Sequence, residues 1–154
     1  MRIILTFCLA IWGFAAQADP ITPRDGWVVM DSVKPFDVLL DDLKSAVRAN
    51  KMAVVTQAGP TGAAANRGIT IPNNRVVGVF NNVFAVRILS LSTAAMIEAP
   101  IRFYVTEDAA GAATLSYKTP SFVFAPYSAE GGDDLEAVSA ELDAIFLAIA
   151  EAAR

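Results

Sequence analysis

Residues 101–118 have the sequence IRFYVTEDAAGAATLSYK, in which two strand patterns flank a short connection. From Ile101 to Thr106, apolar and polar residues alternate, as they do in a strand with one buried face. Gly111 lies in the connection, and a second strand pattern runs from Thr114 to Lys118. Two such runs joined by a short loop predict an antiparallel hairpin. The centre of the fold is therefore expected to be an antiparallel sheet.

Three more strand patterns precede the hairpin, over residues 27–33, 52–56 and 75–81. The third has apolar residues on both faces, which is typical of a central strand covered on both sides. Gly78 within it indicates that another backbone or side chain approaches closely. After the hairpin, Pro120 has no N–H to donate, so it ends the last strand.

Helical patterns alternate with these strands. After Pro35, which suits the first turn of a helix, apolar residues recur at spacings of three and four along one face. These residues are Phe36, Leu39, Leu40, Leu43 and Val47. Acidic residues gather in the first half of this segment and Arg48 and Lys51 at its end, an order that suits the helix dipole. Residues 84–96 also favour a helix, and residues 59–68 have room for a short one.

A last helix is expected after Gly131-Gly132, with Gly132 or Asp133 as its N-cap. It carries an apolar row at three- and four-residue spacing, formed by Leu135, Val138, Leu142, Ile145 and Ile149. We expect this row to pack on the sheet of the same chain. The same spacing also suits a contact between two helices in a dimer, which is the alternative.

Three motifs follow one another through the centre of the chain, over residues 75–81, 99–105 and 116–120. In the order and spacing of these motifs, the chain resembles the bacterial domain-of-unknown-function family 302 over roughly residues 31–127. The family's usual Phe-Gly-Asn-Pro is Phe-Asn-Asn-Val at residues 80–83, so Asn82 matches the family asparagine. The family proline before the hairpin is kept as Pro100, and its Tyr-x-x-Pro is kept as Tyr117 and Pro120.

The resemblance implies an α+β fold in which an antiparallel sheet is backed by helices, similar to the TATA-binding-protein-like β-α-β(n)-α arrangement. It implies a homodimer, as in many members, and no established activity. Many members carry a histidine after the second strand, whereas this chain has none, so a histidine-dependent role does not extend to it. The strand and helix patterns predict the same α+β class on their own.

The first eighteen residues have the pattern of an export signal. Arg2 gives a positive start, residues 3–16 are mostly apolar, and Ala16-Gln17-Ala18 fits a cleavage site. The apolar run is shorter than the about 20 residues that span a membrane, although an uncleaved anchor is the alternative. We therefore expect a cleavable signal over residues 1–18, one domain over residues 19–154, and a periplasmic or secreted protein without stable membrane insertion.

Protein purified from its native host is expected to begin at Asp19, because the small residues Ala16 and Ala18 favour cleavage after Ala18. N-terminal sequencing of that protein measures this directly. A chain that still begins at Met1 would contradict the prediction and favour the anchor.

Composition excludes several kinds of chemistry. The 154 residues include no histidine and one cysteine, Cys8, which lies in the expected signal. Zinc, copper, haem and iron–sulfur sites therefore lose their usual ligands, and no histidine-dependent nucleophile can be built. A formal net charge of −4 disfavours nucleic acid as a partner. We expect no metal site, no cofactor and no nucleic-acid partner.

Four residues are candidates for binding a ligand: Asn81, Asn82, Arg102 and Tyr117. The two asparagines follow a strand, where loops often carry function, but they also suit a plain turn. Arg102 shares a strand face with Tyr104 and could hold an anion, or it could lie on a solvated or dimer-facing surface. Tyr117 could donate to a ligand, or it could bury its ring.

These observations favour an exported, non-catalytic domain that binds a small ligand or a protein partner, with a homodimer as a possible state. One alternative is a hydrolase or isomerase that uses Tyr117 and a carboxylate such as Glu98, which requires the two side chains to meet in one cleft. A second alternative is a structural accessory of an envelope complex.

Overall fold

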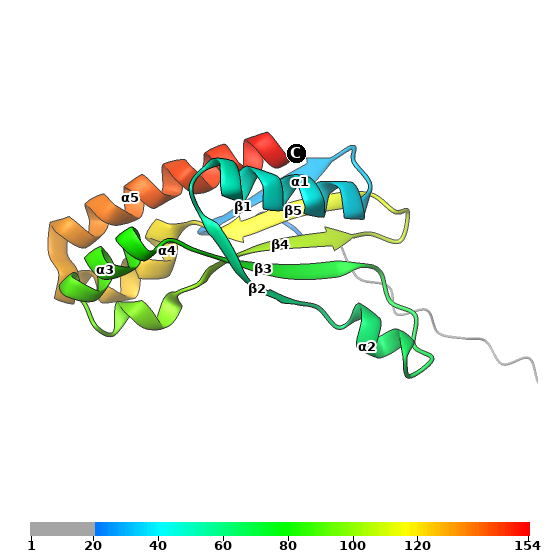
Figure 1. Cartoon of the computed structure of the whole chain (residues 1–154), viewed down its shortest axis with the longest axis horizontal. Coiled ribbons are helices and arrows are strands. Elements are labelled where there is room, and N and C mark those ends of the chain that lie inside the picture. Colours follow the sequence, from blue (N-terminus) through cyan, green and yellow to red (C-terminus); the bar gives the residue numbers. More distant parts are fainter. Residues whose placement is uncertain (1–20) are drawn as a thin grey trace, which may run out of the picture.

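Five antiparallel strands form the sheet of this protein in a computed structural model that describes residues 21–154 (Figure 1). The spatial order is β1-β5-β4-β3-β2. The strands are β1 Trp27–Ser32, β2 Ala53–Ala58, β3 Asn74–Phe80, β4 Ile101–Glu107 and β5 Ala113–Lys118. Strands β4 and β5 form the predicted hairpin, with Phe103 opposite Tyr117. The expected signal at residues 1–18 lies outside the described residues.

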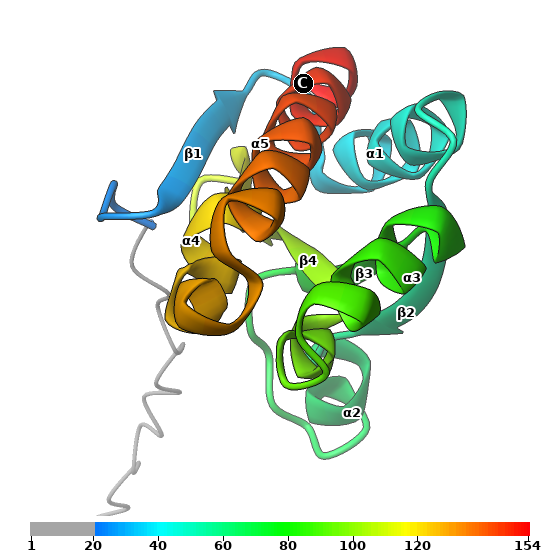
Figure 2. The ribbon, with the colours of Figure 1, turned by 90° about the vertical axis from the view of Figure 1, so that its left-hand side faces the viewer.

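The helices lie mainly on one face of the sheet, where α1 and α5 pack against each other (Figures 1 and 2). They are α1 Phe36–Ala49, α2 Thr61–Ala65, α3 Asn82–Leu91, η1 Ala95–Glu98, α4 Pro120–Phe124, η2 Ala125–Tyr127 and α5 Ser128–Ala153. Helix α3 packs beside α5. The α+β class with an antiparallel sheet backed by helices is confirmed, and the order of elements follows β-α-β(n)-α with α2 and α3 inserted between the strands. Among residues 21–154, no helix is both long and apolar enough to cross a membrane.

Helix α5 closes the core. Leu142, which is 2% exposed, is buried within this single chain, so the last helix packs on its own sheet as expected. Phe146 is fully buried, and its ring stacks on that of Phe103 with centroids 4.7 Å apart. Tyr117 completes the cluster, 5.0 Å from Phe103 and 5.7 Å from Phe146 between ring centroids. These three aromatic rings lie where the sheet and α5 meet.

Helix α1 buries the whole predicted apolar row: Phe36, Leu39, Leu40, Leu43 and Val47. Lys34, just before this helix, ties it to the end of α5. The Nζ atom of Lys34 donates to Oδ2 of Asp42 at 2.7 Å and to the carbonyl oxygen of Ala153 at 2.6 Å. A cation at this point also suits the negative end of the α5 dipole.

The structure differs from the sequence-based expectations in several places. Pro120 does end β5, but it also begins α4, because Thr119 accepts from the N–H of Phe122 and caps a helix that starts with proline. The last helix begins at Ser128, ahead of the expected N-cap at Gly132 or Asp133, although its backbone leaves the helical conformation at Gly132 with φ of 54°, where the break was expected. Its buried row includes Phe146, whereas Ile145 is only half-buried.

Strand β3 is also less enclosed than its sequence predicts. Val77 and Val79 are buried under the helices, whereas Val76, on the opposite face, is half-buried. Gly78 does mark a close approach, as expected. A Cβ atom there would lie 2.2 Å from Oγ1 of Thr56 and 2.9 Å from Cγ of Pro100. The second face of the sheet is therefore covered by neighbouring side chains near Gly78 rather than by a helix layer.

Candidate functional site

The face of the sheet opposite α1 and α5 is the candidate site, and we call it the open face. Within the described residues no helix packs across it, and only η1 and α4 border one end. Strand register gives this face three rows. The first row holds Trp27, Lys118, Arg102 and Gly78; the middle row holds Val29, Ser116, Tyr104 and Val76; the third row holds Asp31, Thr114, Thr106 and Asn74.

A hollow of about 400 Å³, here called the basic hollow, lies at the first row. Its lining residues are Trp27, Val76, Glu98, Ile101, Arg102, Tyr104, Tyr117, Lys118 and Val123. Arg102 and Lys118 are both exposed. Within residues 21–154, neither the guanidinium of Arg102 nor the ammonium of Lys118 makes a hydrogen bond or a salt bridge. Two cations are therefore free to meet a ligand here.

Trp27 gives the basic hollow a flat apolar wall. Cζ of Arg24 lies 5.2 Å from the centroid of the Trp27 ring, and Nζ of Lys118 lies 5.8 Å from it. Both distances fall within the range of cation–π attraction, which favours cations beside the ring. The aromatic ring and the positive charges thus occur together in one place.

A second hollow, of about 450 Å³, lies at the third row and is here called the acidic hollow. Its carboxylates belong to Asp31, Glu107 and Asp108, and neither Lys nor Arg lines it. Asp31 accepts from the hydroxyl of Thr114 at 3.3 Å, and Glu107 accepts from the side-chain amide of Asn73 at 2.9 Å. Asp108 accepts from two backbone N–H groups of the hairpin turn. Tyr104 lines both hollows, so they are neighbours on the open face.

The two asparagine candidates lie away from the basic hollow. Oδ1 of Asn81 accepts from the N–H of Val83 at 2.8 Å and caps α3, while its Nδ2 donates to the carbonyl of Lys51 at 2.9 Å. Asn82 is the exposed first residue of α3. The side chain of Asn81 therefore caps the start of α3, a role that differs from both the ligand site and the plain turn expected from the sequence.

Arg102 and Tyr117 lie on opposite faces of the sheet. The ring of Tyr117 packs against Phe103 and Phe146 under α5, whereas Arg102 lies on the open face with Tyr104. Glu98 borders the basic hollow, but its Oε1 accepts from the hydroxyl of Tyr127 at 2.7 Å. This bond is the main reason that the pKa of Tyr127 is raised. Of the four candidates, Arg102 and Tyr117 line the basic hollow, and only Arg102 lies on the open face.

Stability at alkaline pH is expected to depend on Tyr117. Burial, followed by the charges of Asp143 and Glu151, raises the pKa of Tyr117 from 10.0 to about 12. The folded protein therefore holds the phenolic proton of Tyr117 more tightly than the unfolded chain does. The contribution of this group to the free energy of unfolding is complete below pH 10 and is lost as the pH rises through about 12.

Urea unfolding across this pH range should show a steeper loss of stability for the wild type than for Tyr117→Phe. Tyr104→Phe, on the open face, is the control and should keep the wild-type slope. Equal slopes for the wild type and Tyr117→Phe would contradict the assignment.

Trp27 and Lys118 were missed as candidates from the sequence. Lys118 could have been found, because alternation along residues 114–118 puts it on the face opposite Tyr117. Trp27 could not, because its place in the hollow depends on β1 pairing with β5, in which Trp27 lies opposite Lys118. That pairing joins strands more than 80 residues apart and leaves no local signal.

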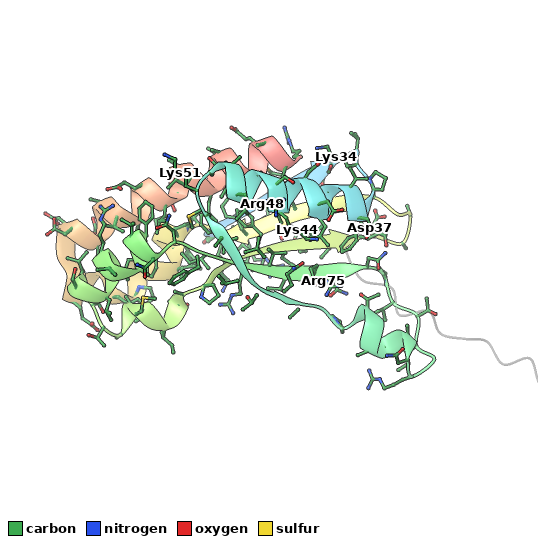
Figure 3. The ribbon with its side chains drawn as sticks, viewed as in Figure 1. Lys34, Asp37, Lys44, Arg48, Lys51 and Arg75 are labelled. Atoms are coloured by element: carbon green, nitrogen blue, oxygen red, sulfur yellow. The ribbon has the colours of Figure 1, made fainter. Side chains whose placement is uncertain are left out.

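Other charged groups lie on the helix-bearing side. Figure 3 shows Lys44 and Arg48 on α1, with Lys51 just beyond its end. Lys44 is paired with Asp41 at 2.9 Å, and Arg48 donates to the hydroxyl of Ser45 at 3.2 Å. Among the described residues, no group of three or more His, Cys, Asp or Glu side chains is arranged to hold a metal ion.

The described residues form an α+β domain with a five-stranded antiparallel sheet, one face of which carries α1 and α5. The sequence model described as "Domain of unknown function DUF302" matches residues 28–150. The chain belongs to the DUF302 family.

A solved structure agrees with this assignment. The crystal structure of an uncharacterized conserved DUF302 protein from Bacillus stearothermophilus is similar, with a TM-score of 0.75 and 14% identity. The similarity covers 85% of this chain and 100% of the other. At this identity it shows the shared fold alone. No curated protein matches the sequence.

Proposed function

We propose that this protein is a non-catalytic binding domain and that its basic hollow binds a small organic anion with a flat apolar part. The observation that carries the proposal is the pair of cations, Arg102 and Lys118, that line the hollow with Trp27 and make no hydrogen bond or salt bridge within residues 21–154. The guanidinium of Arg102 can donate two parallel hydrogen bonds to a carboxylate or phosphate. Trp27 and Tyr104 supply apolar surface for the rest of the ligand.

The size of the hollow supports a small ligand. Its volume of about 400 Å³ lies within the usual range of small-molecule sites, roughly 300–1,000 Å³. The groups around it favour binding over catalysis. Glu98, the nearest carboxylate, already accepts a hydrogen bond from Tyr127, and the Tyr117 ring lies on the other face of the sheet.

Binding can be followed through Trp27. The chain has two tryptophans, so a Trp12→Phe variant leaves Trp27 as the only one. Titrations with benzoate, phenyl phosphate and the neutral analogue benzamide should change the Trp27 fluorescence for the two anions only. Arg102→Gln or Lys118→Gln should weaken benzoate binding by about tenfold or more, since hydrogen bonds to charged groups contribute roughly 1.5–3 kcal/mol.

Arg48→Gln is the matched control, because it removes one exposed positive charge from α1 on the other side of the sheet. It should leave benzoate binding unchanged. Equal affinity for benzoate and benzamide, or wild-type affinity in Arg102→Gln, would overturn the proposal.

We also propose that the ligand is met outside the cytoplasm. The support is the signal pattern of residues 1–18. Cleavage of this signal would remove Cys8, the one cysteine of the chain, and would leave the exported domain without a thiol. A domain of this composition needs no disulfide in an oxidising compartment, since its stability comes from its core.

A further inference from the structure

The basic hollow carries one negative charge as well as two positive ones. Glu98 lines it from η1, at the border of the open face, together with Arg102 of β4 and Lys118 of β5. Within residues 21–154, no salt bridge joins the Glu98 carboxylate to either cation. Groups of opposite charge therefore line the same hollow without neutralising each other.

We propose that the ligand of the basic hollow is a free α-amino acid with an apolar side chain, and that Glu98 selects it by binding its ammonium group. This inference rests on the proposed function, in which Arg102 and Lys118 bind the carboxylate of the ligand. The apolar side chain of the amino acid then lies against Trp27 and Val123, which line the same hollow. A ligand with no positive group would leave Glu98 beside an anion, and like charges repel.

Glu98 has one oxygen available for an ammonium group. Its Oε1 accepts from the hydroxyl of Tyr127 at 2.7 Å, whereas its Oε2 accepts no hydrogen bond from any described residue. An ionised carboxylate can accept several hydrogen bonds over its two oxygens, so the bond to Tyr127 leaves capacity for a ligand. Hydrogen bonds between an ammonium and a carboxylate are among the stronger ones in proteins.

The position of Glu98 is held by contacts within the protein. Tyr127 holds its carboxylate, and Ser92 holds the start of η1. The Oγ atom of Ser92, a buried residue, accepts from the N–H of Ala95 at 3.0 Å and donates to the carboxylate of Glu130. A group that is already oriented loses little freedom on binding, so this arrangement favours recognition by Glu98.

The size of the hollow favours a single amino acid over a peptide. Its volume of about 400 Å³ lies at the low end of the roughly 300–1,000 Å³ of small-molecule sites. A free α-amino acid carries its ammonium and its carboxylate on one carbon atom. A peptide carries these two charges at opposite ends, with a second side chain to accommodate between them.

Two ligands that differ in one group test the role of the ammonium. L-Phenylalanine carries an ammonium group where 3-phenylpropionate has a hydrogen atom. In the Trp12→Phe protein, Trp27 fluorescence should show phenylalanine binding about tenfold or more tightly than 3-phenylpropionate, because its ammonium adds a hydrogen bond between charged groups. The dipeptide phenylalanyl-alanine should bind more weakly than phenylalanine.

Glu98→Gln tests the residue. The hydroxyl of Tyr127 can donate to the amide oxygen of glutamine, so the fold should survive, and circular dichroism checks this. The variant should bind phenylalanine about tenfold or more weakly and should bind 3-phenylpropionate at least as tightly as the wild type. Glu136→Gln is the matched control, because Glu136 is exposed on α5 and does not line the basic hollow. It should leave both affinities unchanged.

Equal affinity of the wild type for phenylalanine and 3-phenylpropionate would overturn the inference. A Glu98→Gln protein that keeps the preference for phenylalanine would also overturn it, as would tighter binding of the dipeptide. In these cases the proposed function stands, provided that benzoate binds and Arg102→Gln weakens its binding. If benzoate, 3-phenylpropionate and phenylalanine all fail to bind, the proposed function is wrong and the inference fails with it.

Discussion

Replacing Phe146 by alanine is expected to lower the free energy of unfolding by about 3–5 kcal/mol. Phe146 is fully buried and stacks on Phe103, with ring centroids 4.7 Å apart and planes at 13°. Truncation removes this contact and leaves a cavity between α5 and the sheet, which Tyr117 and Phe103 can fill only in part. Because small domains are stable by only about 5–15 kcal/mol, a loss of this size threatens the whole fold.

Urea unfolding at several protein concentrations measures this effect. The neighbouring residue Leu147 is 42% exposed on the same helix, so Leu147→Ala is the matched control and should change stability little. The loss in Phe146→Ala should not depend on protein concentration, since its contacts lie within one chain. A loss as small as that of the control would refute the assignment of Phe146 to the core.

Replacing Gly78 by alanine is expected to cost about 1–3 kcal/mol, because the added methyl group overpacks a tight contact. Its Cβ atom would lie 2.2 Å from Oγ1 of Thr56 and 2.9 Å from Cγ of Pro100. The Thr56 side chain can rotate away, but the ring of Pro100 is rigid. Strand β3 must then move relative to β2 and β4, which hold it on either side.

Gly62→Ala is the control for this substitution. Gly62 lies in α2, and a Cβ atom there would meet nothing within 4 Å. Alanine should therefore stabilise the protein by about 0.5–1 kcal/mol, since glycine is the poorer helix former. Thermal unfolding compares the two variants, and a Gly78→Ala protein as stable as Gly62→Ala would show that β3 has more room than the structure gives it.

Local patterns were sufficient to predict most of the fold. Alternation over residues 101–118 predicted the β4–β5 hairpin, and the three- and four-residue spacing from Phe36 to Val47 predicted the buried face of α1. Helix α4 was not predicted, because residues 120–124 are too few to show a helical period. Phe146 was not assigned to the buried row, because Ile145 beside it fits the spacing as well.

The candidate site was harder to predict, because it is built across strands. Arg102 and its shared face with Tyr104 follow from alternation within one strand. The meeting of Arg102 with Trp27 and Lys118 requires the pairing of β1 with β5, which no local pattern contains. Asn81 looked functional because polar loop residues often are, whereas its side chain serves as the cap of α3.

The pairing of β1 with β5 also governs how the chain reaches this fold. Strand β1 has no partner strand until β5 has been synthesised, because Trp27 pairs opposite Lys118. Lys34 also donates to the carbonyl of Ala153, near the end of α5. Such contacts between distant residues give a high contact order and slow folding compared with a helical bundle. On the ribosome, no N-terminal fragment contains the complete core. The nascent chain therefore remains open to chaperones until the final turn of α5 has been synthesised.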